Sequence, residues 1–144
     1  MKRPVWFPLL AILLLSVPSL AGERLSVATD RANVRSGPGT NYPVLWEVER
    51  YYPVEVVSRS KDWIRFSDFE KDQGWLHKDL LDKTKSVVCK GEKANVRQGP
   101  GKDSPVVFIV EKGVPLKLLS KKGEWLEVEH SDGSKGWVIQ SLVW

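Results

Sequence analysis

One octapeptide occurs twice in this sequence, as ANVRSGPG at residues 32–39 and as ANVRQGPG at residues 94–101. Shifting the chain by 62 residues aligns the two copies without a gap, and 17 of the 58 positions in 25–82 are identical to their partners in 87–144. Identity at a fixed offset indicates two copies of one fold. We therefore predict one domain over 24–82, a linker at 83–86 and a second domain over 87–144.

Apolar and polar residues alternate in short runs within each copy. In the first copy these runs fall at 25–27, 54–58, 63–66 and 74–77, and the second copy has counterparts 62 residues on. Alternation of this kind indicates half-buried strands, and the Pro, Gly, Asn and Asp residues between the runs are typical of turns. No window shows a capped helical pattern. The sequence predicts an all-β protein of two small tandem barrels, with five or so short strands each.

The N-terminal residues have the pattern of a secretory signal peptide. Lys2 and Arg3 precede an apolar run, and Ser19-Leu20-Ala21 provides small residues at a cleavage site. An uncleaved anchor is the alternative, but a membrane span needs about 20 apolar residues, and this run is shorter. We expect 1–21 to be a cleaved signal peptide, and the protein to be exported to the periplasm or the extracellular space.

The charge balance argues against nucleic acid as a partner. The chain has 22 Lys and Arg residues and 18 Asp and Glu residues, and two of the basic residues lie in the signal peptide. The remainder carries 20 − 18 = +2 charges and no basic block, whereas nucleic-acid-binding domains show a basic patch. We expect contact with the membrane only through the signal peptide before cleavage.

A set of repeated motifs carries a family resemblance. The first copy has Asn33-Val34-Arg35-Ser36-Gly37-Pro38, Asp62-Trp63, Gly74-Trp75-Leu76 and Leu80, and the second has Asn95-Val96-Arg97-Gln98-Gly99-Pro100, Glu124-Trp125, Gly136-Trp137-Val138 and Leu142. Each copy resembles a bacterial Src-homology-3 (SH3b) domain. The resemblance implies an SH3-like barrel in an exported protein. Such domains often tether proteins to cell-wall peptidoglycan or bind peptides, frequently beside a hydrolase domain.

Candidate catalytic residues do not form a repeated set. Neither His77 nor His130 has a histidine at the matching position of the other copy, and Cys89 aligns with Val27, an apolar position in an opening strand. Cys89 is therefore interpreted as a buried small hydrophobic residue. No phosphate loop, nucleophile elbow or zinc-protease motif is found. We expect no metal and no cofactor, and we interpret the chain as not an enzyme.

Comparison of the two copies separates structural from binding candidates. The repeated residues are assigned to the fold: Asn33, Arg35, Gly37, Pro38, Trp75, Asn95, Arg97, Gly99, Pro100 and Trp137. Val34 and Val96 should point inward, the asparagines should hydrogen-bond the loop backbone, and the arginines should cap carbonyls or stack on a tryptophan. Trp63 and Trp125 are ligand-binding candidates by analogy with SH3 grooves, with barrel architecture as the alternative.

Three more ligand-binding candidates occur only in the first copy: Tyr42, Trp46 and Tyr51, which align with Ser104, Phe108 and Gly113. Aromatic residues near loops suit a peptide or sugar surface, although they would equally suit an interface with the second domain. Tyr52 aligns with Val114 and is expected in the core. The sequence favours a non-catalytic binding module of the cell envelope, with peptidoglycan or an extended peptide as its partner. The alternative is a structural or assembly partner of another exported protein.

Overall fold

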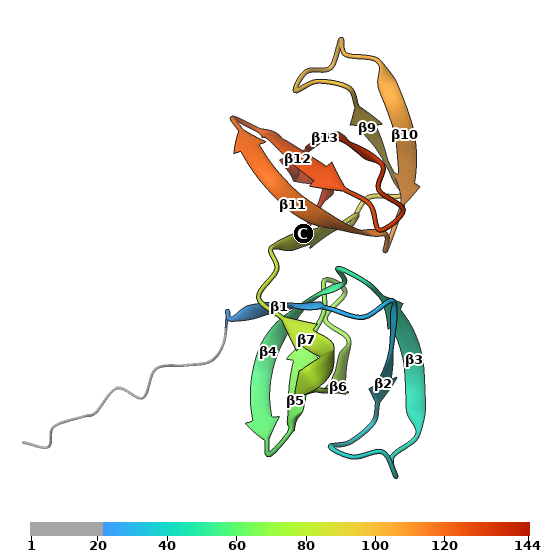
Figure 1. The fold of residues 1–144 in the computed structure, drawn as a ribbon, viewed down its shortest axis with the longest axis vertical. Coiled ribbons are helices and arrows are strands. Elements are labelled where there is room, and N and C mark those ends of the chain that lie inside the picture. The colour runs from blue at the N-terminus through green and yellow to red at the C-terminus, as the bar shows by residue number, and fades with distance from the viewer. Residues whose placement is uncertain (1–21) are drawn as a thin grey trace, which may run out of the picture.

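The computed structural model describes residues 22–144, so the predicted signal peptide lies outside the described residues. The chain forms two β-sheets that follow one another in the sequence, and each sheet curls into a small barrel (Figure 1). This confirms the predicted all-β tandem of SH3-like barrels. Within the described residues, no helix is long and apolar enough to cross a membrane.

The first sheet contains seven strands and one short 3-10 helix. Their bounds are β1 (Arg24–Val27), β2 (Arg31–Arg35), β3 (Val44–Glu49), β4 (Pro53–Ser60), β5 (Trp63–Ser67), β6 (Gln73–His77), η1 (Lys78–Leu80) and β7 (Leu81–Asp82). The strand order is β3-β2-β6-β5-β4-β1-β7, and all pairs are antiparallel.

The second sheet repeats this arrangement with six strands. Their bounds are β8 (Ser86–Val88), β9 (Lys93–Arg97), β10 (Val106–Glu111), β11 (Pro115–Lys122), β12 (Trp125–Glu129), β13 (Lys135–Ile139) and the 3-10 helix η2 (Gln140–Leu142). The order β10-β9-β13-β12-β11-β8 matches that of the first sheet. In the first domain β7 pairs with β1. At the equivalent place in the second domain, the C-terminal Trp144 exchanges two backbone hydrogen bonds with Val88, at 3.0 and 2.9 Å.

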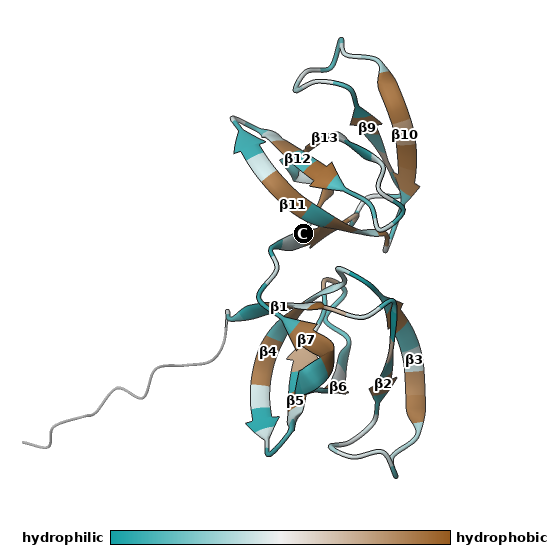
Figure 2. Ribbon diagram, in the orientation of Figure 1, coloured by the Kyte–Doolittle hydropathy of each residue, from teal (hydrophilic) through white to brown (hydrophobic). Residues whose placement is uncertain are grey.

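Each barrel closes around apolar side chains that alternate along its strands. Val34 and Val96, the central residues of the repeated motif, are fully buried, as are Phe66 and Leu116. Tyr52 is also buried, as expected. Figure 2 shows the resulting bands of hydrophobic and hydrophilic residues along the strands. Strand periodicity, with one face directed to the core, therefore explains why these segments form a barrel.

The structure has more strands than the sequence pattern predicted. The Asn-Val-Arg of each motif ends a strand, β2 or β9, and the segments 44–49 and 106–111 form β3 and β10. These segments were not recognised because four of the six residues in each strand are exposed and several of these, such as Leu45 and Ile109, are apolar, so the apolar residues do not mark one face.

The two domains contact each other through their opening strands. The Arg24 guanidinium donates hydrogen bonds to the carbonyl oxygens of Ser86 and Trp144, each at 3.2 Å, and lies 4.0 Å from the centroid of the Trp144 ring. The hydroxyls of Ser26 and Ser86 hydrogen-bond at 2.5 Å. Val88 belongs to the apolar cluster of the first domain. The copies are therefore packed together rather than joined only by the linker.

Candidate functional site

Both domains have a groove at the same place in the barrel. The groove of the first domain has a volume of about 310 Å³ and is lined by Arg31, Ala32, Asn33, Arg35, Thr40, Trp63, His77 and Leu80. The groove of the second domain has a volume of about 300 Å³ and is lined by Lys93, Asn95, Arg97, Lys102, Trp125, Ile139 and Leu142. Every residue of the second groove aligns with a residue of the first at the offset of 62. We call them the twin grooves.

Strand geometry explains how the repeated motif reaches the twin grooves. Successive side chains of a strand point to opposite faces. Val34 enters the core of the first domain, so Asn33 and Arg35 on either side of it face outward. The same alternation exposes Asn95 and half-buries Arg97 beside the buried Val96. One strand of the motif therefore contributes both a core residue and two groove residues.

The tryptophans of the twin grooves begin β5 and β12. Trp63 is paired with His77 across the β5–β6 ladder, and their rings meet edge to face at 5.3 Å and 83°. Trp125 is paired with Ile139 in the same way. Both tryptophans are half-buried, and each lines the groove of its own domain.

The arginines of the motif hold the loop beside each groove. Arg35 Nη1 donates to the carbonyl oxygens of Thr40 and Tyr42 at 3.1 and 3.0 Å, and Arg97 Nη1 donates to that of Ser104 at 2.9 Å. Of the two roles considered from the sequence, the structure shows carbonyl capping. Each guanidinium is thereby held in place while it lines the groove.

The Gly-Pro-Gly segments form the same turn in both loops. The N–H of Gly39 donates to the carbonyl of Gly37 at 2.9 Å, and Gly101 donates to Gly99 at the same distance. Pro38 and Pro100 lie between these glycines, outside both grooves. Backbone hydrogen bonds also join the two ends of each loop. The N–H of Ser36 donates to the carbonyl of Pro43 at 3.0 Å, and the N–H of Gln98 donates to that of Pro105 at 2.9 Å.

The Gly-Trp pairs bring two strands close together. A Cβ on Gly136 would lie 2.6 Å from Val96 Cγ1 and 2.7 Å from the Arg97 carbonyl oxygen, so only glycine fits against β9. The following tryptophans, Trp75 and Trp137, are half-buried on β6 and β13 and line neither twin groove.

The structure differs from one expectation about the asparagines. Asn33 and Asn95 are exposed on their strands, and within residues 22–144 neither side-chain amide makes a hydrogen bond. The reason is their position: they lie on β2 and β9, before the turn, and not inside the loop whose backbone they were expected to bind. Both amides are free to bind a ligand in the groove.

The first-copy aromatic residues are not gathered in one place. Tyr42 is 41% exposed and its ring covers Gly37 in the loop, beside the carbonyl held by Arg35. Trp46 packs its ring against Phe66, with centroids 6.4 Å apart, and lines a separate pocket of about 350 Å³ with Asp30 and Glu49. Tyr51 occupies a turn with φ of 73°, where the second copy has Gly113.

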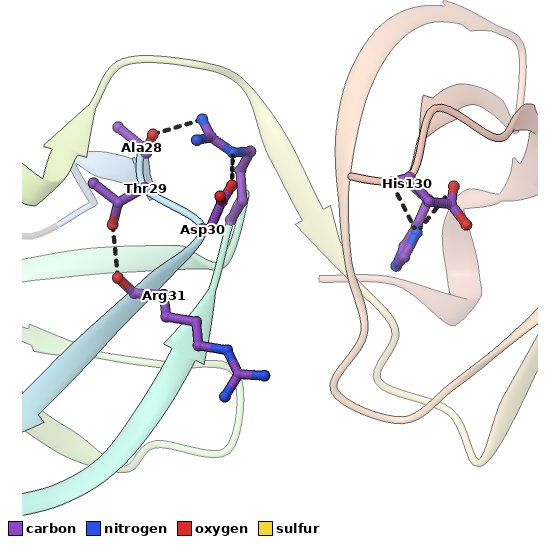
Figure 3. Close-up of polar contacts among 7 residues, drawn as sticks. Ala28, Thr29, Asp30, Arg31 and His130 are labelled. Carbon is purple, nitrogen blue, oxygen red and sulfur yellow. Dashed lines mark hydrogen bonds and ion pairs between the residues drawn. The ribbon is translucent and has the colours of Figure 1, made fainter.

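Sequence reasoning missed several groove residues, among them Arg31, His77, Lys93, Lys102 and the two leucines at 80 and 142. The repeat offset could have found them, because the groove positions correspond pairwise; the residue types differ at the pairs Arg31/Lys93, Thr40/Lys102 and His77/Ile139, and the identical leucines were assigned to the family motif. Figure 3 shows the turn that precedes Arg31, in which Thr29 Oγ1 donates to the Arg31 carbonyl at 2.9 Å. Arg50 supports the same turn with a 2.6 Å bond to the Ala28 carbonyl and a 3.1 Å ion pair with Asp30.

The remaining reactive side chains have structural surroundings. Cys89 is fully buried, its thiol donates to the Gly91 carbonyl at 3.3 Å, and burial raises its pKa. His130 Nδ1 accepts from the backbone N–H of Asp132 at 3.3 Å (Figure 3), and hydrogen bonds from Ser134 lower the pKa of Asp132. Within residues 22–144, no three His, Cys, Asp or Glu side chains gather in a way that could hold a metal ion.

Comparison with known proteins agrees with this twofold architecture. The sequence model of the bacterial SH3 domain matches residues 28–83 and 90–144. The chain belongs to the bacterial SH3 domain family. The predicted boundaries at 24, 82 and 87 are not tested by this match and stay predictions.

Relatives of the chain include proteins named as cell-wall amidases. It is 26% identical over 139 residues to the protein named as N-acetylmuramoyl-L-alanine amidase YrvJ of Bacillus subtilis, covering 89% of this chain and 26% of that protein. It is 38% identical over 61 residues to the protein named as cell wall amidase LytH of Staphylococcus epidermidis, covering 42% of this chain and 21% of that protein. An NlpC/P60 family protein from Bacillus cereus has a similar structure, with a TM-score of 0.40, 13% identity and coverage of 85% of this chain and 56% of that one.

These relatives correct the expectation that the protein is not an enzyme. The proteins that it resembles are named as amidases, and they point toward cell-wall hydrolysis. The chain spans about a quarter of their length. Absence of a catalytic motif from so short a stretch was therefore no basis for excluding an enzymatic role.

Proposed function

We propose that these tandem bacterial SH3 domains form a cell-wall-binding module that acts in cell-wall hydrolysis, with each twin groove binding peptidoglycan or its extended peptide part. The observation that carries this proposal is the pairing of the grooves, in which the Asn, Arg, Trp and Leu positions are identical in both domains. Similarity to proteins named as cell-wall amidases supports the wall as the location of the ligand.

The proposed binding residues are Trp63 and Trp125, with Asn33 and Asn95 beside them. A half-buried indole gives a ligand a flat apolar surface, and an exposed amide offers one donor group and one acceptor to a peptide backbone. Tyr42 flanks the first groove and is proposed as an additional contact. Trp46 and Tyr51 line neither groove, although Trp46 lines a neighbouring pocket that shares Arg31 with the first groove, so a role for them would require contacts outside the twin grooves.

Two grooves in one packed chain favour bivalent attachment. The domains are joined by the hydrogen bonds of Arg24 and by a short linker, so the second groove is held close to a wall polymer once the first is occupied. Bivalency predicts that loss of one groove weakens wall attachment strongly, and that loss of both abolishes it. This location in turn requires export, for which residues 1–21 are the proposed signal.

Sedimentation with purified cell-wall sacculi tests the proposal. The variants Asn33→Ala, Asn95→Ala and their combination remove exposed groove amides without touching the core, and Trp63→Ala and Trp125→Ala remove the aromatic surfaces. We expect the Trp variants to bind sacculi about tenfold more weakly or worse, as for the aromatic hot spots of other interfaces. Asn41→Ala, at an exposed loop position outside the grooves, is the matched control. Wild-type protein that stays in the supernatant would refute wall binding.

A further inference from the structure

We propose that the twin grooves bind a peptide through its carboxylate groups, an inference that rests on the proposed function and names its ligand chemistry. The first groove is lined by Arg31, Arg35 and His77, and the second by Lys93, Arg97 and Lys102. No Asp or Glu lines either groove within residues 22–144. Residues 22–144 contain 20 Lys and Arg side chains and 18 Asp and Glu side chains, so a lining with Lys and Arg but no Asp or Glu does not follow from composition.

The arginine in each groove is prepared for a carboxylate. The hydrogen bonds of Arg35 and Arg97 within the described residues use Nη1 alone. Nη2 and Nε remain to donate to a ligand, and the loop carbonyls already hold the guanidinium in place. Arginine binds carboxylates with two parallel hydrogen bonds, and a side chain that is already ordered loses less entropy on binding.

The second groove has the stronger positive character. In the first domain, Arg31 forms a 3.3 Å ion pair with Glu47, and His77 Nδ1 accepts a 3.1 Å hydrogen bond from the backbone N–H of Asp79, whose carboxylate lies 3.7 Å from the same nitrogen. The second domain has Ile109 and Ser141 at these two acidic positions. Within residues 22–144, neither Lys93 nor Lys102 forms an ion pair. We therefore expect the groove of the second domain to bind a given acidic peptide more tightly than the first.

The apolar parts of the grooves favour a peptide over a bare anion. Trp125, Ile139 and Leu142 line the second groove beside its cations, and Asn95 presents an amide to the same space. An extended peptide with acidic and small residues supplies carboxylates for the cations, backbone groups for the amide and aliphatic atoms for the tryptophan. A neutral sugar chain would form no charge-assisted hydrogen bonds with these three cations.

The test uses full-length protein and two synthetic peptides, acetyl-Ala-Glu-Ala-Glu-Ala-amide and its Gln counterpart. NMR titration follows the indole N–H signals of Trp63 and Trp125, which report each groove separately and detect weak binding. We expect the Glu peptide to shift both signals, Trp125 at lower concentration, and the Gln peptide to shift neither. The variant Lys93→Gln/Lys102→Gln should weaken binding at Trp125 about fivefold, the effect of two exposed ion pairs of about 0.5 kcal/mol each.

A matched control separates groove chemistry from net charge. Lys83 and Lys85 are exposed in the segment between the two sheets and line neither groove, so Lys83→Gln/Lys85→Gln removes the same charge away from Trp125. Equal weakening by both pairs would show a general charge effect and overturn the inference. Equal binding of the Glu and Gln peptides would also overturn it. Polyphosphate is titrated in the same way as the Glu peptide. If it shifts the Trp125 signal at a lower concentration than the Glu peptide does, the grooves are reassigned to phosphate.

Sacculi whose carboxyl groups have been amidated distinguish this inference from the proposed function. We expect amidation to reduce sedimentation of the wild-type protein several-fold. Sedimentation with native and amidated sacculi alike would keep wall binding and overturn the carboxylate inference. A shift of the Trp125 signal by the Glu peptide without sedimentation of the protein with sacculi would retain the carboxylate site. It would refute the cell wall as the source of the ligand.

Discussion

The phenol hydroxyl of Tyr52 donates a 2.9 Å hydrogen bond to Oδ2 of Asp68, and both side chains are buried. Asp68 Oδ1 also accepts from the backbone N–H groups of Glu70 and Asp72, each at 3.0 Å. The pair links the start of β4 to the turn between β5 and β6. The second domain has Val114 and His130 at these positions, so this buried polar link belongs to the first domain alone.

Loss of the Tyr52 hydroxyl should destabilise the first domain. Tyr52→Phe leaves a buried carboxylate oxygen without its donor, which costs about 1–3 kcal/mol of unfolding free energy. Urea unfolding followed by tryptophan fluorescence measures the change. Tyr42→Phe removes a hydroxyl from an exposed ring and should change stability by less than about 0.5 kcal/mol. Equal midpoints for wild type and Tyr52→Phe would show that water replaces the lost donor.

The same residue should make stability fall at alkaline pH. Burial, the hydrogen bond to Asp68 and the nearby negative charges raise the pKa of Tyr52 in the folded state. The unfolded chain releases this proton near pH 10, whereas the folded chain keeps it, so unfolding is favoured as pH rises above about 10. The contribution of Tyr52 is therefore complete below pH 10 and decreases above it.

A comparison of wild type with Tyr52→Phe isolates this effect, because all other titrating groups are common to both. The stability advantage of wild type should be constant between pH 7 and 9 and should narrow by about 1.4 kcal/mol between pH 9 and 11. Urea unfolding at these three pH values provides the measurement. An advantage that stays unchanged at pH 11 would mean that Tyr52 ionises equally in both states.

Replacement of Tyr51 by glycine should stabilise the turn before β4. Tyr51 has φ of 73°, Gly113 has φ of 88°, and their N–H groups donate to equivalent carbonyls, those of Val27 and Cys89, at 2.9 and 2.8 Å. A left-handed residue other than glycine costs about 1–2 kcal/mol, and glycine adds about 0.5–1 kcal/mol of chain entropy. Tyr51→Gly should therefore stabilise the first domain by about 0.5–1 kcal/mol in thermal or urea unfolding.

The reverse change in the second domain is the control. A Cβ on Gly113 would meet no atom within 4 Å, so Gly113→Ala tests the backbone conformation alone and should cost about 1 kcal/mol. Destabilisation by Tyr51→Gly would show that packing of the Tyr51 ring outweighs the strain of its backbone. Unchanged sacculus binding by Tyr51→Gly would at the same time argue against this residue as a ligand contact.

Cys89 should react only when the second domain opens. Its side chain is buried and its thiol has a raised pKa, and the thiolate is the reactive form. We expect a thiol reagent at pH 8 to label native protein slowly and urea-unfolded protein at once. Cys89→Val, which copies Val27 of the first domain, should keep the unfolding free energy within about 1.5 kcal/mol of wild type. Immediate labelling of the native state would contradict the buried position.

Much of the fold could be predicted from the sequence. The offset of 62 residues predicted two domains, and apolar alternation at residues such as Phe66 and Val128 predicted strands, because burying one face of a sheet requires that period. The burial of Val34, Val96 and Cys89 followed from the same rule. The edge strands β3 and β10 were missed because apolar residues such as Leu45 and Ile109 also occupy their exposed face, which obscures the alternation.

Only the tertiary structure showed which repeated residues lie together. Asn33, Arg35, Trp63 and Leu80 come from two strands and a 3-10 helix, and the curl of the barrel brings them to one groove. Sequence reasoning attributed the repeated octapeptide to the fold and looked for ligand contacts at Trp63 and Trp125 and among the first-copy aromatic residues that do not repeat. In the barrel a strand serves both purposes, since its inward residues build the core and its outward residues line the groove. The octapeptide by itself determined the repeat and the turn, whereas the strand order β2-β6-β5 in the curled sheet decided that its outward side chains form a site.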